Sequence, residues 1–172
     1  MTFIDEAYYS SFKTKLQLAH ELNTQYGESL KTLPEISNNL ALLEVLAQSL
    51  SEHMGSLNFA RFCSDCSAKP GGGCCSVAMS EESDAILLLI NLLAGHQVTI
   101  QRDDNFECYL LGDFGCILRY KPVFCLNYNC HAIKSRSGSI PFESYLSTSA
   151  KILQCQWVIE KCILDRLKKI MP

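Results

Sequence analysis

The distribution of cysteine is the feature that most constrains this chain. Eight of its ten cysteines lie between Cys63 and Cys130, and four of these fall between Cys63 and Cys75. So many thiols in one region can serve a disulfide framework, a redox dithiol, a nucleophile or a metal centre. Three glycines at 71–73 precede Cys74, and their conformational freedom would let the backbone fold back and present a thiol.

The composition favours thiols that stay reduced. The chain has 172 residues, of which 48% are hydrophobic and 19% charged, and this predicts one folded domain. Its first residues lack the basic start and apolar core of a signal peptide. The longest apolar run, Ala85–Ala94, is about half of a bilayer span. We therefore expect a cytoplasmic protein whose cysteines are ligands or reduced core residues rather than disulfides.

The overall charge limits the classes of partner. A net charge of −3 and a pI near 5.8 argue against a nucleic-acid or anionic-membrane binder, because phosphate binding needs a basic face. We expect no nucleic-acid partner and no membrane partner. A protein partner is left open by the sequence.

Apolar periodicity predicts a mainly α-helical fold in a single domain, residues 1–172. Residues 1–60 are expected to form an N-terminal helical hairpin, and residues 140–172 a long C-terminal helix. Between them, residues 61–131 are expected to form a small irregular or β insert that is rich in cysteine and binds metal.

The two expected N-terminal helices have identifiable boundaries. Gly27 is a candidate stop for the first helix, and Thr32 and Glu35 have the spacing of a capping box for the second. The apolar seam of the second helix consists of Ile36, Leu40, Leu43, Ala47, Leu50 and Met54. We assign this seam to an intrachain core, with a homodimer through the N-terminal helices as the alternative to a monomer.

The residues after the first cysteines predict a third helix and two strands. Ser80 is the expected cap of the helix and Gly95 its end, and the positive end of this helix is expected to lie near the cysteines and favour thiolates. Residues Gln97–Gln101 and Phe106–Gly112 alternate enough to predict short strands. Pro122 should end any regular element that reaches it.

Ligand spacing favours a metal centre. Cys63 and Cys66 are three positions apart, so that two thiolates could reach one ion from a single turn. A thioredoxin-type dithiol has the same spacing, but no βαβ pattern surrounds it here. The candidate ligands are Cys63, Cys66, Cys74, Cys75, Cys116 and Cys125, with Cys108 and Cys130 in reserve or in a second site. Because adjacent side chains diverge, we expect one of Cys74 and Cys75 to bind and the other to support.

The remaining cysteines and the histidines have ordinary explanations. Cys155 and Cys162 lie two helical turns apart on the expected last helix, too far for a disulfide, and are predicted to be core residues. A Cys–His nucleophile is not indicated, because nothing in the sequence pairs His131 or another histidine with a thiol. No phosphate-binding, zinc-protease or hydrolase motif is present, so we do not predict an enzyme.

The order of the cysteines resembles the YkgJ-type cysteine-cluster family, a zinc- or iron-chelating domain. Its members have a CxxC pair, then adjacent cysteines, then a cysteine before an apolar stretch, and finally two cysteines with a proline shortly before the last. The matching residues here are Cys63, Cys66, Cys74, Cys75, Cys108, Cys116, Pro122 and Cys125. The resemblance implies a metal centre. Lys121 stands where the family has arginine, which implies a cation that offsets thiolate charge.

These observations lead to one functional expectation and one alternative. We expect a cysteine-ligated iron–sulfur cluster, of the [4Fe–4S] type, in a redox, sensing or cluster-handling role, because the thiols outnumber the four that one closed site needs. The alternative is a structural zinc module whose helices bind a protein partner.

Overall fold

The computed structural model describes residues 2–59, 73–128, 130–136 and 139–170, so Cys63 and Cys66 lie outside the described residues. The fold is mainly α-helical, with one small sheet and an irregular cysteine-rich region, as the periodicity predicts. The helices are α1 Phe3–Tyr9, α2 Phe12–Lys31, α3 Pro34–Ser56, α5 Val77–Ser80, α6 Ala85–Leu93, α7 Val123–Asn127, α8 His131–Arg136 and α9 Ser139–Ile170. Strands β1 Leu111–Gly112 and β2 Gly115–Cys116 pair antiparallel.

Helix capping differs from the prediction at the start of α3. The capping box predicted for Thr32 and Glu35 is wrong, because Leu33 is the N-cap and makes no side-chain cap bond. Thr32 instead closes α2, and its hydroxyl donates to the carbonyl oxygen of Ser29 at 2.8 Å. Pro34 occupies the first turn of α3. A backbone N–H at that place would have no acceptor within the helix, so proline costs no hydrogen bond there.

Gly27 does not stop α2, which runs on to Lys31. The residue is buried, and a Cβ placed on it would lie 2.7 Å from Asn23 Oδ1 and 3.7 Å from the side chain of Leu93 in α6. The glycine therefore leaves room for the Asn23 side chain of its own helix, within ordinary packing distance of α6, and does not mark a helix end.

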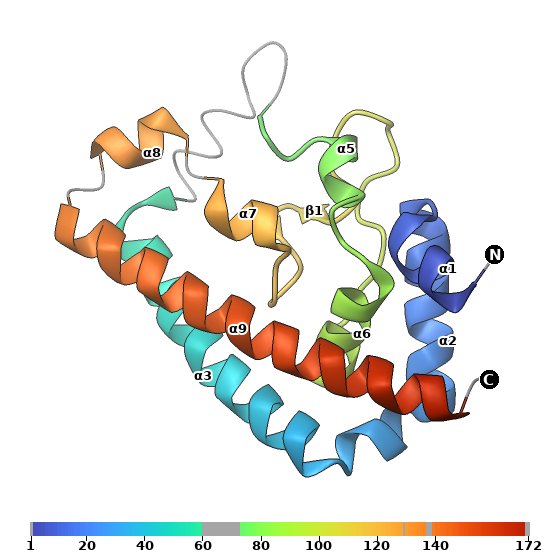
Figure 1. The fold of residues 1–172 in the computed structure, drawn as a ribbon. Helices are drawn as coiled ribbons and strands as arrows, with labels where there is room; N and C mark the ends of the chain where they lie inside the picture. The colour runs from blue at the N-terminus through green and yellow to red at the C-terminus, as the bar shows by residue number, and fades with distance from the viewer. Residues whose placement is uncertain (1, 60–72, 129, 137–138, 171–172) are drawn as a thin grey trace.

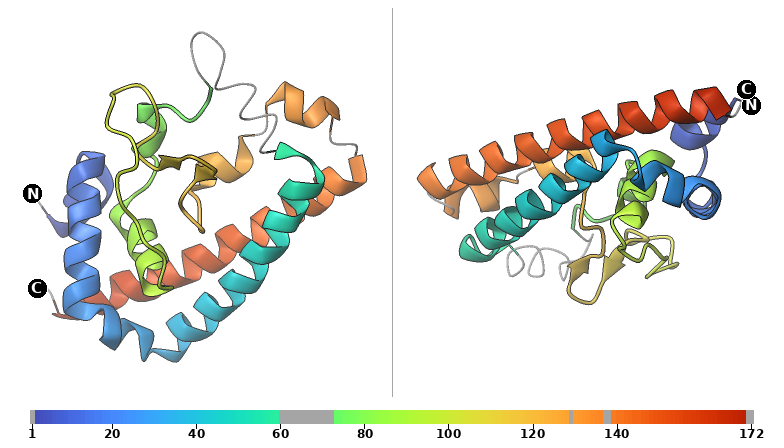
Figure 2. Two further views of the ribbon diagram at one scale, coloured as in Figure 1. Left: turned by 180° about the vertical axis from the view of Figure 1, so that it is seen from behind. Right: turned by 90° about the horizontal axis from the view of Figure 1, so that it is seen from below.

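The two longest interfaces join α3 to α9 and α2 to α6 (Figure 1). Helices α2 and α3 diverge after their connecting turn, so they do not form the expected packed hairpin (Figure 2). The physical reason is that the predicted seam of α3, including buried Ile36 and Leu43, faces α9 instead. The seam is thus an intrachain core, as predicted.

Helices α3 and α9 run antiparallel. Cys155 in α9 contacts Asn39 near the start of α3, and the rings of Phe59 and Tyr145 lie 5.0 Å apart at the opposite end. The predicted apolar face of α9 is confirmed by burial of Ile152, Cys155, Ile159, Ile163 and Leu167, with Ile170 packed against the core. No helix in the described ranges is both long and apolar enough to cross a bilayer.

The predicted third helix is two elements. Ser80 is the last residue of the four-residue α5, and the N-cap of α6 is Asp84, whose carboxylate accepts the Leu87 N–H at 2.8 Å. The assignment of Ser80 as the cap is therefore wrong. Gly95 does end the helix, with a φ of +85° directly after the C-cap residue Ala94.

The two predicted strands, Gln97–Gln101 and Phe106–Gly112, do not form a ladder. One backbone bond joins them, from the Gln101 N–H to the Tyr109 oxygen at 2.7 Å. Side chains take up neighbouring backbone groups instead: the Asp104 carboxylate accepts two N–H groups, and Arg102 Nε donates to the Leu111 oxygen. The sheet is formed by β1, the last two residues of the second predicted strand, and β2, which follows it in the chain.

A carboxylate pair lies where α1, α6 and α9 meet. The Tyr8 hydroxyl of α1 donates a hydrogen bond to Glu160 of α9. Burial and the charge of Glu160 together raise the pKa of Asp84 to about 6, against the backbone N–H of Leu87, which lowers it. The junction therefore carries more negative charge at neutral pH than its buried position favours.

We expect Asp84→Asn to stabilise the fold above about pH 6 by about 1–2 kcal/mol. The folded-state pKa of Asp84 is raised, so its contribution to stability is present at low pH and is lost as the pH rises through about 6. Asparagine stays neutral and is an equally good N-cap. Urea denaturation from about pH 5 to about pH 8 measures the difference. The control is Asp165→Asn, at an exposed site, whose stability should run parallel to that of the wild type over this range. The same parallel course for Asp84→Asn would contradict the prediction.

Candidate metal centre

Backbone bonds join the first cysteine segment to the second. Cys74 and Cys75 directly precede α5, and the Cys108 N–H donates to the Cys75 oxygen at 3.0 Å. An isolated bridge between Ser76 and Glu107 extends this pairing. Thiols that are more than thirty positions apart in sequence are thereby held on neighbouring backbone.

The β1–β2 hairpin is the third segment that carries a thiol. Cys116 in β2 lies opposite Leu111 in β1, and the Leu111 N–H donates to the Cys108 oxygen at 2.9 Å. Gly115 has a φ of +110°, a conformation that favours glycine, at the turn that returns the chain to Cys116. Cys108 and Cys116 are therefore positioned by one short supersecondary element.

Helix α7 supplies the fourth segment, with Cys125 in its only complete turn. Burial, together with the charges of Cys116, Cys108 and Cys74, raises the pKa of Cys125 to about 12, against the opposing charge of Lys121. Four separate segments thus bring their thiols within electrostatic reach of one another, in the part of the molecule where α5, β1 and α7 lie (Figure 1). Cys108, held in reserve by the sequence analysis, belongs to this group.

Cys74 and Cys75 act on each other's protonation. The neighbouring Cys75 lowers the pKa of Cys74 to about 6, against the effect of burial, and Cys74 together with burial raises the pKa of Cys75. Cys74 is therefore the more acidic thiol of the two. A deprotonated thiol is the form that binds metal.

Lys121 lies close enough to act on two of the thiols. Burial raises the pKa of Cys116, and the Lys121 ammonium opposes this effect. The same ammonium acts in the same direction on Cys125. A cation that acts on two candidate ligands lowers the cost of holding both as thiolates.

Ser80 is a site residue that the sequence analysis placed in another role. It is fully buried, its hydroxyl donates to Cys108 Sγ at 3.3 Å, and it accepts the Tyr109 N–H at 2.9 Å. Nothing in the local sequence pairs Ser80 with residue 108, because the contact depends on the bridge between two loops. The hydroxyl orients one candidate ligand and satisfies one backbone donor.

The two cysteines of α9 belong to the helix interface. Cys155 Sγ donates to Asn39 Oδ1 of α3 at 3.2 Å, and the pKa of Cys162 is raised by burial and by Glu35 of α3. Their shared face therefore looks toward α3, in agreement with the core role predicted for them. Cys130 is half-buried and precedes α8, where its carbonyl oxygen accepts the Lys134 N–H at 3.0 Å.

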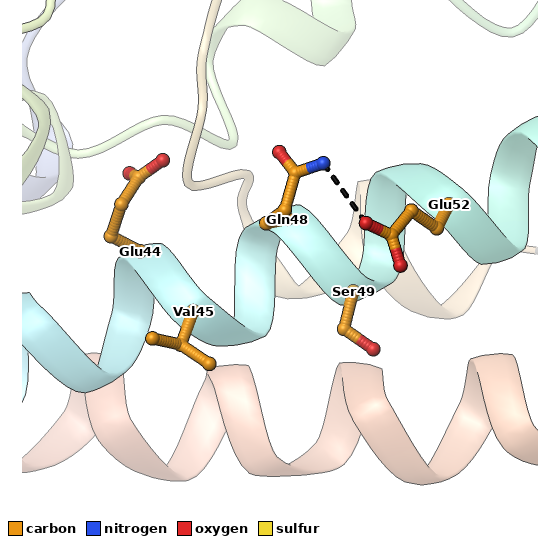
Figure 3. A pocket seen from close by; sticks show the side chains of 5 residues that line it. All are labelled: Glu44, Val45, Gln48, Ser49 and Glu52. Carbon is orange, nitrogen blue, oxygen red and sulfur yellow. Dashed lines mark hydrogen bonds between the residues drawn. The ribbon is translucent and has the colours of Figure 1, made fainter.

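The outer face of α3 is the other surface feature of note. Glu44, Val45, Gln48, Ser49 and Glu52 line a shallow hollow there, with Gln48 bonded to Glu52 at 3.1 Å (Figure 3). Val45 is 67% exposed and Leu42 is 50% exposed on this helix. No thiol lines the hollow, but two of its residues, Glu44 and Gln48, also bind Arg119 in the segment between Cys116 and Cys125.

Within the described ranges, no three Cys, His, Asp or Glu side chains are arranged to hold one ion. Cys63 and Cys66, the first two candidate ligands, lie outside those ranges. Thiolates are nevertheless the donors that zinc and iron–sulfur clusters take, so the type of donor gathered here fits such a group. Comparison with known proteins found no matching family model, no matching curated protein and no matching solved structure.

We expect Ser80→Ala to destabilise the metal-free protein by about 1–3 kcal/mol, because it leaves the Tyr109 N–H without its acceptor and Cys108 without its donor. Ser37→Ala, which removes an exposed hydroxyl from α3, should change stability by less than about 0.5 kcal/mol. Urea denaturation under reducing conditions compares the two. Equal, small losses in both variants would show that the Ser80 contacts contribute nothing.

Proposed function

We propose that the chain is a metal-binding protein whose cysteine-rich region holds a thiolate-ligated iron–sulfur cluster. The observation that carries this proposal is that backbone contacts gather thiols from separate segments: the Cys108 N–H donates to the Cys75 oxygen, and the hairpin that holds Cys116 is bonded to the Cys108 oxygen. The charges of Cys74, Cys108 and Cys116 also reach Cys125. Thiols with a raised pKa keep their protons at neutral pH, and a metal ion that replaces the protons removes the repulsion that opposes their ionisation.

The proposed ligands come from the six cysteines of the sequence analysis together with Cys108. Among the described residues, Cys74, Cys108, Cys116 and Cys125 supply one thiol from each segment, with Cys75 adjacent to Cys74. Cys63 and Cys66 have the spacing of a ligand pair and compete with these for the four positions. A cytoplasmic location, which keeps thiols reduced, belongs to the same proposal.

The chain's own residues would tune such a centre. A bound cluster supplies one-electron transfer. Cys116 is half-buried, the Ser80 hydroxyl donates to Cys108 Sγ, and Lys121 provides nearby positive charge. Hydrogen bonds to sulfur, burial and net charge are the variables that set the potential of an iron–sulfur centre. These contacts support a redox or sensing role.

A structural zinc module is the second candidate. The same thiols suit zinc, and the exposed Leu42 and Val45 on the outer face of α3 favour a role in which the helices bind a protein partner. In that case the metal would contribute to folding and the helical surface would be the working part.

Anaerobic purification followed by an absorption spectrum and analysis of iron, zinc and acid-labile sulfide tests the proposal. A brown protein with iron and sulfide in comparable amounts supports the cluster, and a colourless protein with about one zinc per chain supports the second candidate. A chain that binds neither under these conditions overturns both.

We expect Cys125→Ser to abolish metal loading, because ligand loss removes binding energy coupled to folding. Cys162→Ser is the matched control, since Cys162 lies on α9 near Glu35 of α3 and should retain wild-type metal content. Elemental analysis of both variants, expressed and purified in parallel, gives the result. Metal loss in Cys162→Ser together with full loading of Cys125→Ser would overturn the ligand assignment.

A further inference from the structure

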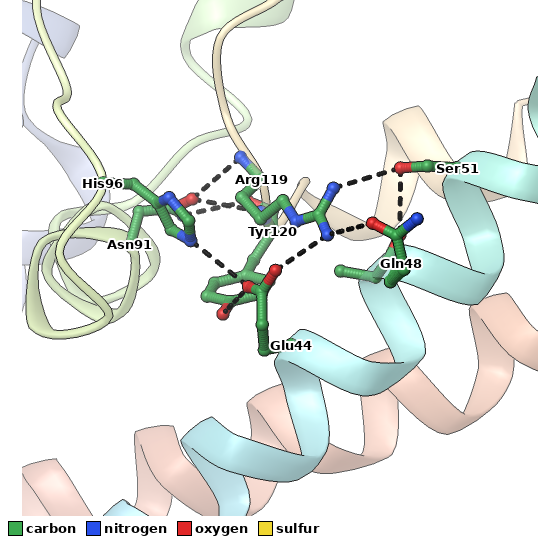
Figure 4. A network of polar contacts seen from close by, with 8 residues as sticks. Glu44, Gln48, Ser51, Asn91, His96, Arg119 and Tyr120 are labelled. Atoms are coloured by element: carbon green, nitrogen blue, oxygen red, sulfur yellow. Dashed lines mark hydrogen bonds and ion pairs between the residues drawn. The ribbon is translucent and has the colours of Figure 1, made fainter.

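The segment between Cys116 and Cys125 has no regular structure before Pro122, yet it must place both thiols. Its middle is held by Asn91, a fully buried side chain on α6. Asn91 Oδ1 accepts the N–H groups of Arg119 and Tyr120, both at 3.0 Å, and Nδ2 donates to the Tyr120 oxygen at 3.0 Å (Figure 4). One amide thus replaces the backbone partner that a neighbouring strand would provide.

The amide is fully used. Nδ2 makes its second bond to the Leu87 oxygen of α6 at 3.0 Å, so all four hydrogen-bonding positions of Asn91 are filled. Burying an amide costs free energy unless its bonds are made, and here they are made mostly to the irregular segment. Three of the four hydrogen bonds of the Asn91 side chain therefore go to the backbone of residues 119–120, and one goes to α6.

Helix α3 binds the same two residues by their side chains. The Arg119 guanidinium donates to Glu44 at 2.8 Å, to Ser51 at 3.1 Å and to Gln48 at 3.2 Å, and the Tyr120 hydroxyl donates to the other oxygen of Glu44 at 3.0 Å (Figure 4). A charge-assisted contact of this kind is both directional and strong.

Helix α9 holds the next residue. Gln156 is buried and its Nε2 donates to the Lys121 oxygen at 3.1 Å. Three consecutive residues, 119–121, are thus each bound by side chains of the surrounding helices α3, α6 and α9. Lys121 is also the cation that acts on Cys116 and Cys125.

We propose that Asn91, Glu44 and Gln156 are positioning residues of the metal centre, which fix residues 119–121 so that Cys116, Lys121 and Cys125 are pre-arranged for the metal. This inference rests on the proposed function. It identifies three polar residues, on three different helices, that act on the centre only through the segment they hold. Partners outside the ligand shell commonly change metal affinity by about 10- to 100-fold when they are removed.

The test compares metal release from Asn91→Leu and Arg119→Gln with release from the wild-type chain. Each loaded protein is mixed with excess chelator, and the loss of the metal's absorption, or of bound zinc, is followed with time. We expect release to be about 10- to 100-fold faster in Asn91→Leu and faster by a smaller factor in Arg119→Gln. Arg119→Gln keeps the test available if Asn91→Leu does not fold.

Two control variants separate positioning from general destabilisation. Lys13→Gln removes an exposed ion pair to Asp103, and Ile36→Val removes one buried methyl from the seam of α3 that faces α9. Both should release metal at the wild-type rate after correction for any change in thermal midpoint. A second readout uses the metal-free protein: the amide hydrogens of Arg119 and Tyr120 should be protected from exchange in the wild type and lose protection in Asn91→Leu.

The outcomes distinguish this inference from the function on which it rests. A wild-type chain that never holds metal overturns both. If the wild-type chain holds metal but Asn91→Leu or Arg119→Gln releases it no faster than Ile36→Val does, the positioning role is overturned. The proposed function is not affected by that result. Faster release together with lost amide protection supports the inference.

Discussion

The antiparallel contact of α9 with α3 is the interaction on which the rest of the structure depends. It brings the last helix of the chain back along the third, and the buried Ile159 and Ile163 of α9 belong to the same core as Ile36 of α3. Apolar burial over this length supplies the main stabilisation of both helices, which propensity alone would leave marginal. It also fixes the distance between the polar side chains that reach the cysteine-rich region from each helix.

The cysteine-rich region has little secondary structure of its own, so its geometry depends on individual polar contacts. A hydroxyl on α5, an amide on α6 and an amide on α9 each bind a backbone group that a neighbouring strand would otherwise pair. Such contacts are specific in direction, and each leaves a buried group unpaired when it is lost. The helical core thus determines where the loops lie, and these few contacts determine which thiols meet.

The helices could be predicted from sequence because their apolar residues repeat with the helical period, as in the seams of α3 and α9. Their pairing could not, since the α3 seam fits either α2 or α9 by pattern alone. The predicted pairing of residues 97–101 with residues 106–112 was wrong, because the side chains of Asp104 and Arg102 bind backbone groups that a strand ladder would have used. For the site, cysteine spacing identified the thiols, whereas Ser80 and Asn91 act across contacts of long sequence separation that no local pattern encodes.

Gly27 illustrates a different kind of constraint. A methyl group there needs Asn23 to adopt another rotamer, but a longer side chain would also meet Leu93 of α6. A side chain longer than that of alanine would therefore have to displace both Asn23 and Leu93. The residue that can stand at this position is limited by the packing of α2 against α6, and this limit is independent of the chemistry of the cysteine group.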